Sequence, residues 1–337
     1  MSLNFTSDNS HLSELNEHTD LVLASRAGKT AASIAIRCND LLADPVAKYL
    51  LASRATNTMK AYVSDLAAFI NWGGSIPSSP ETVARYLAER ADHQKPATLS
   101  RHLASIAVAH RAKGLASPAA HELVRAVLKG IRRIKGTAQR EAKPLLRDDL
   151  LTVLDAMGDN LKDTRDRSLL LLGFAGGFRR SELVGLNFED LAFVQHGMII
   201  TLRHSKTDQE GKGRKIGIPF GRTKHCPVKT TEHWLRRAGI SQGPIFRPVA
   251  KGGRVTASRL SGEAVCCIIR DRLTHTGFNP EGFSGHSLRS GFATSAAQAD
   301  APSWRIRQQT GHANDMMLSR YVRDGQLFVG NAASTVL

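Results

Sequence analysis

Helical periodicity runs through almost the whole chain and constrains its fold more than any other feature of the sequence. Apolar residues recur at spacings of three and four between residues 41 and 134, and again between residues 147 and 325. The alternating pattern of strands occurs only at GMIITLRHSK (197–206) and RKIGIP (214–219), which are joined by the polar TDQEGKG. The chain is therefore predicted to be mainly α-helical, with a single β-hairpin.

The first helical stretch predicts a bundle of four or five helices. One apolar stripe ends at Gly73-Gly74 and the next begins at Pro80, and these residue types commonly stop and start helices. The stripes comprise Met59, Tyr62, Val63, Leu66, Phe69 and Ile70, then Val83, Tyr86 and Leu87, then Leu99, Leu103 and Ile106, and finally Leu123, Val127, Leu128 and Ile131.

Changes in composition divide the chain. Residues 1–40 are weakly patterned and predict a flexible arm. The basic, polar stretch RRIKGTAQREAKPLL contains a glycine and a proline and predicts an extended linker over 135–146. We therefore expect a helical domain over 41–134, a mixed α+β domain over 147–325 and a tail over 326–337.

The charge balance points to a polyanionic partner. Lysine and arginine number 46 against 30 aspartates and glutamates, which gives a net charge of +16 at pH 7. Both predicted domains carry an excess of positive charge. Residues 41–140 include 15 basic and 6 acidic residues, and residues 141–337 include 28 basic and 19 acidic residues. Duplex DNA is the expected partner of both domains. A ribosomal or nonspecific basic protein would have the same balance.

Cysteine spacing and hydropathy argue against several protein classes. Cys38, Cys226, Cys266 and Cys267 lack the spacing of metal ligands, and adjacent cysteines rarely bridge each other. No run approaches the roughly eighteen apolar residues of a membrane span, and no basic segment followed by an apolar one opens the chain. We expect reduced thiols, no membrane association, and a cytoplasmic protein associated with the nucleoid.

The third predicted helix of the first domain has a basic polar side that could enter a major groove. His102 and His110 are placed on that side with three basic residues. Two further arginines lie at the start of the basic stretch RRIKGTAQREAKPLL, just before the predicted linker. The residues expected to contact DNA are Arg101, Arg111, Lys113, Arg132 and Arg133. A solvated helix face is an equally good interpretation of any one of them.

Three segments of the second domain carry residues suited to binding a phosphate or transferring a proton. In GGFRRSEL, Arg179 and Glu182 are three residues apart, so the carboxylate could orient a guanidinium that holds two phosphate oxygens. In GHSLRSG, His286 and Arg289 have the same spacing. Lys206 lies at the predicted hairpin turn, from which a lysine can reach into a groove.

A fourth segment, GHANDMMLSRYVRDG, places His312 nine residues before Tyr321. A continuous helix would put these two side chains on opposite faces. Asn314 could cap and restart the helix, so that Leu318 and Tyr321 share a stripe. Taken alone, this segment suggests that Tyr321 is a core residue. Taken with the three other segments, it suggests that Tyr321 is a nucleophile.

Taken in order, these segments resemble the tyrosine recombinases, the phage-integrase family. The matching text is GFRRSEL for a first arginine box, SKT for a hairpin lysine, HSLRSG for a second box, and GH followed nine residues later by Y. The resemblance extends over roughly residues 45–325. It implies a SAM-like helical core-binding domain joined by a linker to a mixed α+β catalytic domain, with the pair clamped around DNA.

The resemblance also implies a role for each residue of the motifs. The arginines would hold the scissile phosphate, and the tyrosine would attack it to form a 3′-phosphotyrosyl bond. The predicted catalytic residues are Arg179 and Arg289 on the phosphate, Lys206 as general acid to the departing 5′ oxygen, His286 in proton transfer, His312 as a hydrogen-bond partner of the phosphate, Glu182 in support, and Tyr321 as nucleophile.

Clustered cations fit this chemistry. A phenol with a pKa of about 10 is a poor nucleophile at neutral pH until its anion is stabilised. Removing one preorganised donor typically costs about 2.7–4 kcal/mol of barrier, so these residues can provide a large acceleration without a cofactor, metal or ATP. The resemblance implies strand exchange through a Holliday junction by four copies on two sites with inverted-repeat cores, the free protein being monomeric or weakly associated.

Departures from the family pattern are few. Phe178 and Arg180 stand where smaller or aliphatic residues are usual. Residues 1–40 are too few and too weakly patterned for an extra arm-binding domain, so we expect a simple recombinase of the Cre or Xer kind. The apolar residues 327–329 suggest a tail that docks on a neighbouring copy.

Two other functions use similar residues. A type IB topoisomerase shares the residue classes and the phosphotyrosine but reseals the original strand. A non-catalytic DNA-binding regulator would need only the basic bundle, and would leave the four catalytic segments without a purpose.

Overall fold

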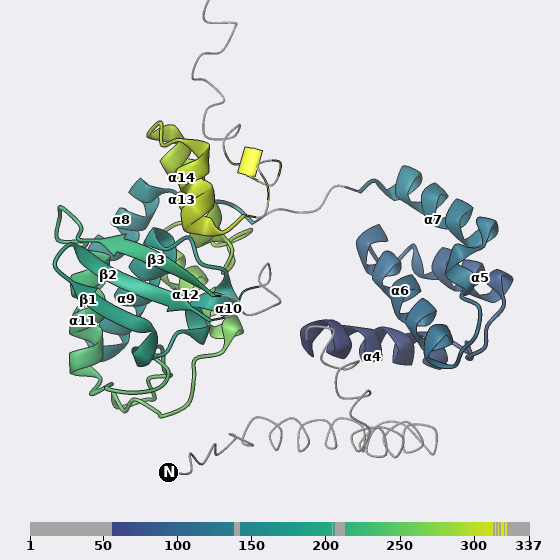
Figure 1. Cartoon of the computed structure of the whole chain (residues 1–337), viewed down its shortest axis with the longest axis horizontal. Helices are drawn as coiled ribbons and strands as arrows, with labels where there is room; N and C mark the ends of the chain where they lie inside the picture. The colour runs from purple at the N-terminus through teal and green to yellow at the C-terminus, as the bar shows by residue number, and fades with distance from the viewer. Residues whose placement is uncertain are drawn as a thin grey trace, which may run out of the picture. The chain divides into compact units, whose positions relative to one another are not determined.

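The chain divides into two units, Met1–Gln139 and Arg140–Leu337, and helices make up most of the described part of the first (Figure 1). The computed structural model describes residues 56–137, 142–203, 205, 213–312, 314, 316, 318, 319 and 321. The predicted arm, the predicted tail and Lys206 lie outside these residues. In the first unit the elements are α4 (Thr56–Asn71), α5 (Pro80–Arg90), α6 (Pro96–Ala112), η1 (Pro118–Ala120) and α7 (Glu122–Lys135).

Local sequence sets the helix starts of the first unit. Pro80 and Pro96 occupy the first turns of α5 and α6, where the missing N–H leaves no hydrogen bond unmade. The Ser79 hydroxyl accepts the Thr82 N–H and caps α5. The core then gathers the predicted stripes, including Phe69, Tyr86, Leu87, Leu99, Ile106, Leu128 and Ile131.

Three stripe positions of the first unit were predicted wrongly. Val63 is 53% exposed, Ile70 37% and Leu123 39%. In α7 the buried face follows Val124, Leu128 and Ile131, so Leu123 lies one residue off the stripe. In α4 the buried face is narrower than the apolar stripe and includes the acidic Asp65.

The second unit combines helices with a small sheet. The predicted hairpin is present as β2 (Gly197–Leu202) and β3 (Arg214–Pro219), which pair in antiparallel fashion from Gly197 opposite Pro219 to Leu202 opposite Arg214. The elements are α8 (Arg147–Asp155), α9 (Leu161–Ala175), α10 (Arg180–Gly185), η2 (Phe188–Asp190), β1 (Leu191–Val194), β2 (Gly197–Leu202), β3 (Arg214–Pro219), α11 (Pro227–Arg237), α12 (Gly262–His275), α13 (Ser287–Gln298) and α14 (Ser303–Thr310).

A third strand, β1, corrects the prediction of a single hairpin. It pairs with β2 in antiparallel fashion and completes a sheet of order β1-β2-β3. None of its four residues, LAFV, is buried, and their sequence lacks the alternation of apolar and polar residues that would predict a strand. β2 and β3 do alternate, and they bury Met198, Ile200, Leu202, Ile216 and Ile218 in the main core.

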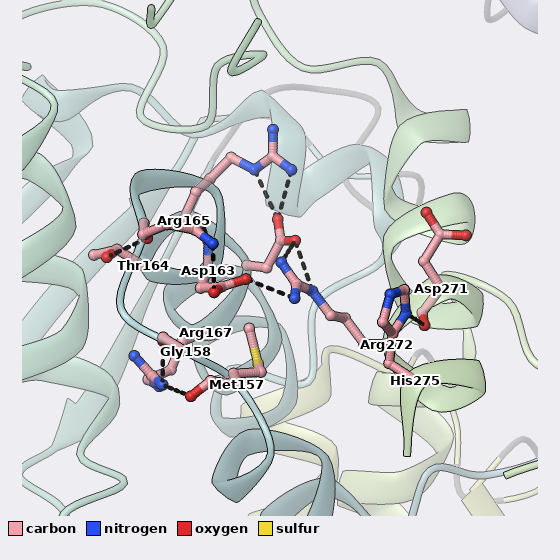
Figure 2. A network of polar contacts seen from close by, with 11 residues as sticks. Met157, Gly158, Asp163, Thr164, Arg165, Arg167, Asp271, Arg272 and His275 are labelled. Atoms are coloured by element: carbon pink, nitrogen blue, oxygen red, sulfur yellow. Dashed lines mark hydrogen bonds and ion pairs between the residues drawn. The ribbon is translucent and has the colours of Figure 1, made fainter. Parts of the chain in front are cut away.

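A buried charge network fixes α9 against α12 (Figure 2). The carboxylate of Asp166 is fully buried and accepts hydrogen bonds from Arg165 and from Arg272. Arg272 also pairs with Asp163, at 2.6 Å between Nη1 and Oδ1. Burial alone would lower the pKa of Arg272, but its bonds to Asp166 and Asp163 raise that pKa above the usual value.

The helices in the described ranges are short or carry charged and polar side chains. None of them is long and apolar enough to cross a bilayer.

Candidate active site

The first arginine box forms a capping box at the start of α10. Arg179 is the N-cap residue, and its main-chain N–H donates to Glu182 Oε2 at 2.9 Å. Its Nη1 donates to Oε1 of the same carboxylate at 2.6 Å, and Nη2 to the carbonyl of Gly311 at 3.3 Å. The predicted contact is therefore present, although Arg179 precedes the helix. The buried Glu182 orients a guanidinium that remains 16% exposed.

Arg289, near the start of α13, is buried in the site. Its Nη1 donates to the carbonyls of Gly177, at 2.7 Å, and Thr310. Its Nη2 is also buried and has no hydrogen-bond partner in the part of the chain that the structure describes. Burial and then the charge of Arg179 lower the pKa of Arg289 to about 10. An unsatisfied, partly destabilised guanidinium is suited to bind an anionic oxygen.

The tyrosine hydroxyl lies beside the second box. His286 immediately precedes α13, and its Nε2 is 2.8 Å from the hydroxyl of Tyr321. The Tyr321 ring is half-buried, with its centroid 6.3 Å from that of His286 and 5.8 Å from that of His312. The nine-residue separation thus brings His312 and Tyr321 together.

The core interpretation of Tyr321 is also partly correct. Its ring packs against the small apolar cluster of Ala293, Ala297, Ile306 and Leu318. The same packing that buries one side of the ring holds its hydroxyl beside His286.

His312 is buried and neutral. Burial, followed by the charges of Arg289 and Arg179, lowers its pKa to about 3. Its Nδ1 is 2.7 Å from the Thr310 hydroxyl, which itself donates to the Ile306 carbonyl. The hydroxyl proton is therefore committed, so His312 donates through Nδ1–H and leaves Nε2 as an acceptor. A bound phosphate would favour protonation of Nε2.

The pKa of His286 is lowered for related reasons. Desolvation is the largest cause, and the charges of Arg289 and Arg179 follow. A neutral imidazole at 2.8 Å from the Tyr321 hydroxyl can accept its proton.

Several contributors to the site were missed from the sequence. Arg214, at the start of β3, bonds to the last carbonyls of α14. Thr310 connects Arg289 with His312. Gly177 and Gly311 have φ values of +55° and +68°, a conformation that favours glycine. The glycines stood next to the recognised motifs, but no periodicity or spacing marked Arg214 or Thr310.

The basic side predicted for α6 is only partly present. His102 and His110 are buried, because they continue the apolar stripe of Leu99, Leu103 and Ile106, so their placement on a DNA-facing side was wrong. His102 lies between the Asp65 carboxylate and the Tyr86 hydroxyl.

The five basic residues expected to contact DNA occupy different settings. Arg101 donates two hydrogen bonds to Asp65. Lys113 bonds to the Ile76 carbonyl and Arg132 to Ser100. Arg111 and Arg133 are exposed. Contact with DNA stays a prediction for all five.

The described cysteines are not arranged as metal ligands. Cys226 and Cys266 are buried and Cys267 is exposed, all three as free thiols. Across the described residues, no group of three or more His, Cys, Asp or Glu side chains could hold a metal ion.

The family model described as "Phage integrase family" matches residues 143–326, more than half of the chain. The chain belongs to the phage integrase family. An integrase/recombinase xerD homolog of Selenomonas ruminantium is 40% identical over 307 residues, which cover 88% of this chain and 90% of that protein. The chain is accordingly a tyrosine site-specific recombinase, and both the topoisomerase and the regulator are disfavoured.

Solved structures share the fold. XerH recombinase bound to a palindromic difH substrate in a post-cleavage complex is 17% identical, with a TM-score of 0.60, and the match covers 82% of this chain and 78% of that one. A lambda integrase tetramer bound to a Holliday junction is 18% identical, with a TM-score of 0.56 and coverage of 96% and 89%. The expected mainly α-helical fold with a mixed catalytic unit is confirmed.

Proposed function

We propose that the chain cleaves and rejoins duplex DNA through a covalent bond between Tyr321 and a 3′ phosphate. The observation that carries this proposal is the 2.8 Å contact between the Tyr321 hydroxyl and His286 Nε2, next to the buried Arg289. The arrangement pairs a nucleophile with a base and with a preorganised cation.

The cleavage step follows from these positions. Nη2 of Arg289 and the guanidinium of Arg179 bind the non-bridging oxygens of the phosphate. The Tyr321 oxygen forms a bond to phosphorus as its proton passes to His286, and the bond from phosphorus to the 5′ oxygen breaks. Lys206 protonates that 5′ oxygen. Attack by a 5′ hydroxyl of another strand reverses the step and releases Tyr321.

The proposed partner is duplex DNA that contains inverted-repeat core sites. The protein is proposed to act in the cytoplasm, in association with the nucleoid. Two such sites are brought together by a homotetramer, which exchanges strands through a Holliday junction. The net charge of +16 and the likeness to a lambda integrase tetramer on a Holliday junction support it. The residues proposed to contact the DNA are Arg101, Arg111, Lys113, Arg132 and Arg133, and residues 326–337 are proposed to dock on a neighbouring copy.

A covalent-capture experiment tests the nucleophile. A random-sequence duplex library is incubated with the protein, and SDS-resistant protein–DNA species are selected to obtain a cleavable site. That site is then built into a nicked suicide duplex. Wild type and the control Tyr62→Phe, which alters a tyrosine of α4, should accumulate covalent product. Tyr321→Phe should accumulate none, and persistent product in that variant would refute the assignment.

A further inference from the structure

Arg214 is a half-buried cation that the proposed cleavage step does not use. It opens β3, and its guanidinium reaches the end of α14. Nη1 donates to the carbonyls of Gln308 and Gln309 at 3.0 Å each, and Nη2 to that of Thr310 at 3.2 Å. The last carbonyls of a helix lack partners within it and carry partial negative charge. Arg214 therefore caps the C-terminal end of α14.

Thr310 connects the capped end of α14 to Arg289 and His312. Its carbonyl also accepts a hydrogen bond from Arg289 Nη1, and its hydroxyl bonds to Nδ1 of His312. Thr310 is fully buried, and its hydroxyl is further tied to the Ile306 carbonyl at 2.7 Å. A shift of the end of α14 would thus displace the acceptor of Arg289 and the partner of His312 together.

The turn after α14 is built around the Arg214 guanidinium. Gly311 has a φ of +68°, and a Cβ added there would lie 2.8 Å from Cζ of Arg214, closer than real contacts allow. The carbonyl of Gly311 accepts a hydrogen bond from Nη2 of Arg179. The same turn therefore holds groups that contact both arginines of the two boxes.

Charge provides a second link between Arg214 and the site. Burial is the largest cause of the lowered pKa of Arg289 and of His312, and the charge of Arg214 contributes further to each. Arg214 thus favours the neutral form of His312 and adds to the positive potential that an anion would meet.

We propose that Arg214 is a positioning residue for phosphodiester cleavage, which holds the end of α14 so that Thr310 aligns Arg289 and His312 on the phosphate. This proposal rests on the proposed function. Arg214 acts through Thr310, because its hydrogen bonds go to main-chain carbonyls rather than toward a substrate.

The test uses the full chain and the selected nicked duplex, with Arg214→Ala and Arg214→Lys. The matched control is Arg247→Ala, which removes an arginine that bonds to the carbonyls of Pro244 and Gln242 in a loop of the same unit. Single-turnover cleavage at saturating protein, affinity for the duplex and thermal stability are measured for each variant.

Arg214→Ala should slow cleavage by about 10- to 100-fold, since a small misplacement of catalytic groups has effects of this size. Its affinity for the duplex should stay at the wild-type level. Arg214→Lys should be intermediate, because an ammonium cannot span three carbonyls as a planar guanidinium does. Free guanidinium chloride should restore part of the rate in Arg214→Ala, whereas sodium chloride at the same ionic strength should not.

Cleavage by both Arg214 variants at the rate of Arg247→Ala would overturn the proposal. A loss of rate that follows lost affinity or lost thermal stability, without guanidinium rescue, would also overturn it. If Arg214→Ala does not fold, Arg214→Lys provides the same comparison. Absence of covalent product with wild type would count against the proposed function itself, whereas normal cleavage by the variants counts against Arg214 alone.

Discussion

Two charge clusters of the second unit, each built from buried and half-buried side chains, differ in their ratio of positive to negative charge. The cluster with equal numbers of both charges is suited to hold the fold, and the cluster with excess positive charge is suited to bind an anion. The network between α9 and α12 pairs two arginines with two aspartates (Figure 2). The candidate active site gathers three arginines around the carboxylate of Glu182. The first cluster comprises Arg165, Arg272, Asp163 and Asp166, and the second Arg179, Arg214, Arg289 and Glu182.

Arginine pKa values move in opposite directions in the two clusters. In the network, the bonds to Asp166 and Asp163 outweigh burial and raise the pKa of Arg272. At the site, burial lowers the pKa of Arg214 and, together with Arg179, that of Arg289. Buried like charges reduce stability unless a partner compensates them. The unbalanced cluster is therefore the one suited to a phosphate.

Asp166→Asn should break the balanced cluster and have the largest effect on stability. It leaves Arg165 and Arg272 without their shared buried carboxylate, so the free energy of unfolding should fall by about 3–5 kcal/mol. Urea unfolding measures the loss. Asp159→Asn, which alters an aspartate that is 80% exposed, is the control and should change little. A loss for Asp166→Asn no larger than the control would show that the network does not hold α9 to α12.

Arg289→Gln should have the opposite profile. It removes a charge that the fold does not balance, so the free energy of unfolding should fall less than in Arg272→Gln, while single-turnover cleavage should fall by about 10²–10³-fold. In the matched variant Arg272→Gln, the main effect should be a fall in the free energy of unfolding. If urea unfolding shows equal destabilisation in both variants, the distinction between the two clusters fails.

Acid pH should produce a smaller effect through His312, whose pKa is about 3 in the folded protein and near 6.5 when unfolded. As the pH falls below 6.5, the unfolded state takes up the proton first, so the free energy of unfolding decreases until the pH approaches 3. The slope is at most about 1.4 kcal/mol per pH unit. His312→Gln should show a shallower decline in urea unfolding, and identical slopes would contradict a buried neutral His312.

The helices could be predicted because apolar residues at helical spacing bury one face. Helical spacing predicts that a segment is a helix more reliably than it predicts which side of that helix faces the core. Leu123 lies one residue off the buried stripe, and His102 continues the stripe of α6 although it is polar. β1 was missed because a four-residue edge strand with no buried side chain has no period to detect.

The site could be predicted only where its residues form local motifs. Arg179 with Glu182, and His286 with Arg289, are close in sequence, and both pairs lie in the site that the structure shows. Arg214 and Thr310 are 96 residues apart, and their contact depends on how β3 meets the end of α14. Lys206 lies outside the described residues, so its role stays a prediction.

Tyr321, held beside the arginine cluster with excess positive charge, is proposed as the residue to which DNA becomes covalently attached. Mass spectrometry of the protein trapped on the nicked suicide duplex, after nuclease and protease digestion, tests it most directly. We expect a nucleotide joined through its 3′ phosphate to the tyrosine oxygen of the peptide that contains Tyr321. An adduct on any other residue, with an unmodified Tyr321 peptide, would contradict it.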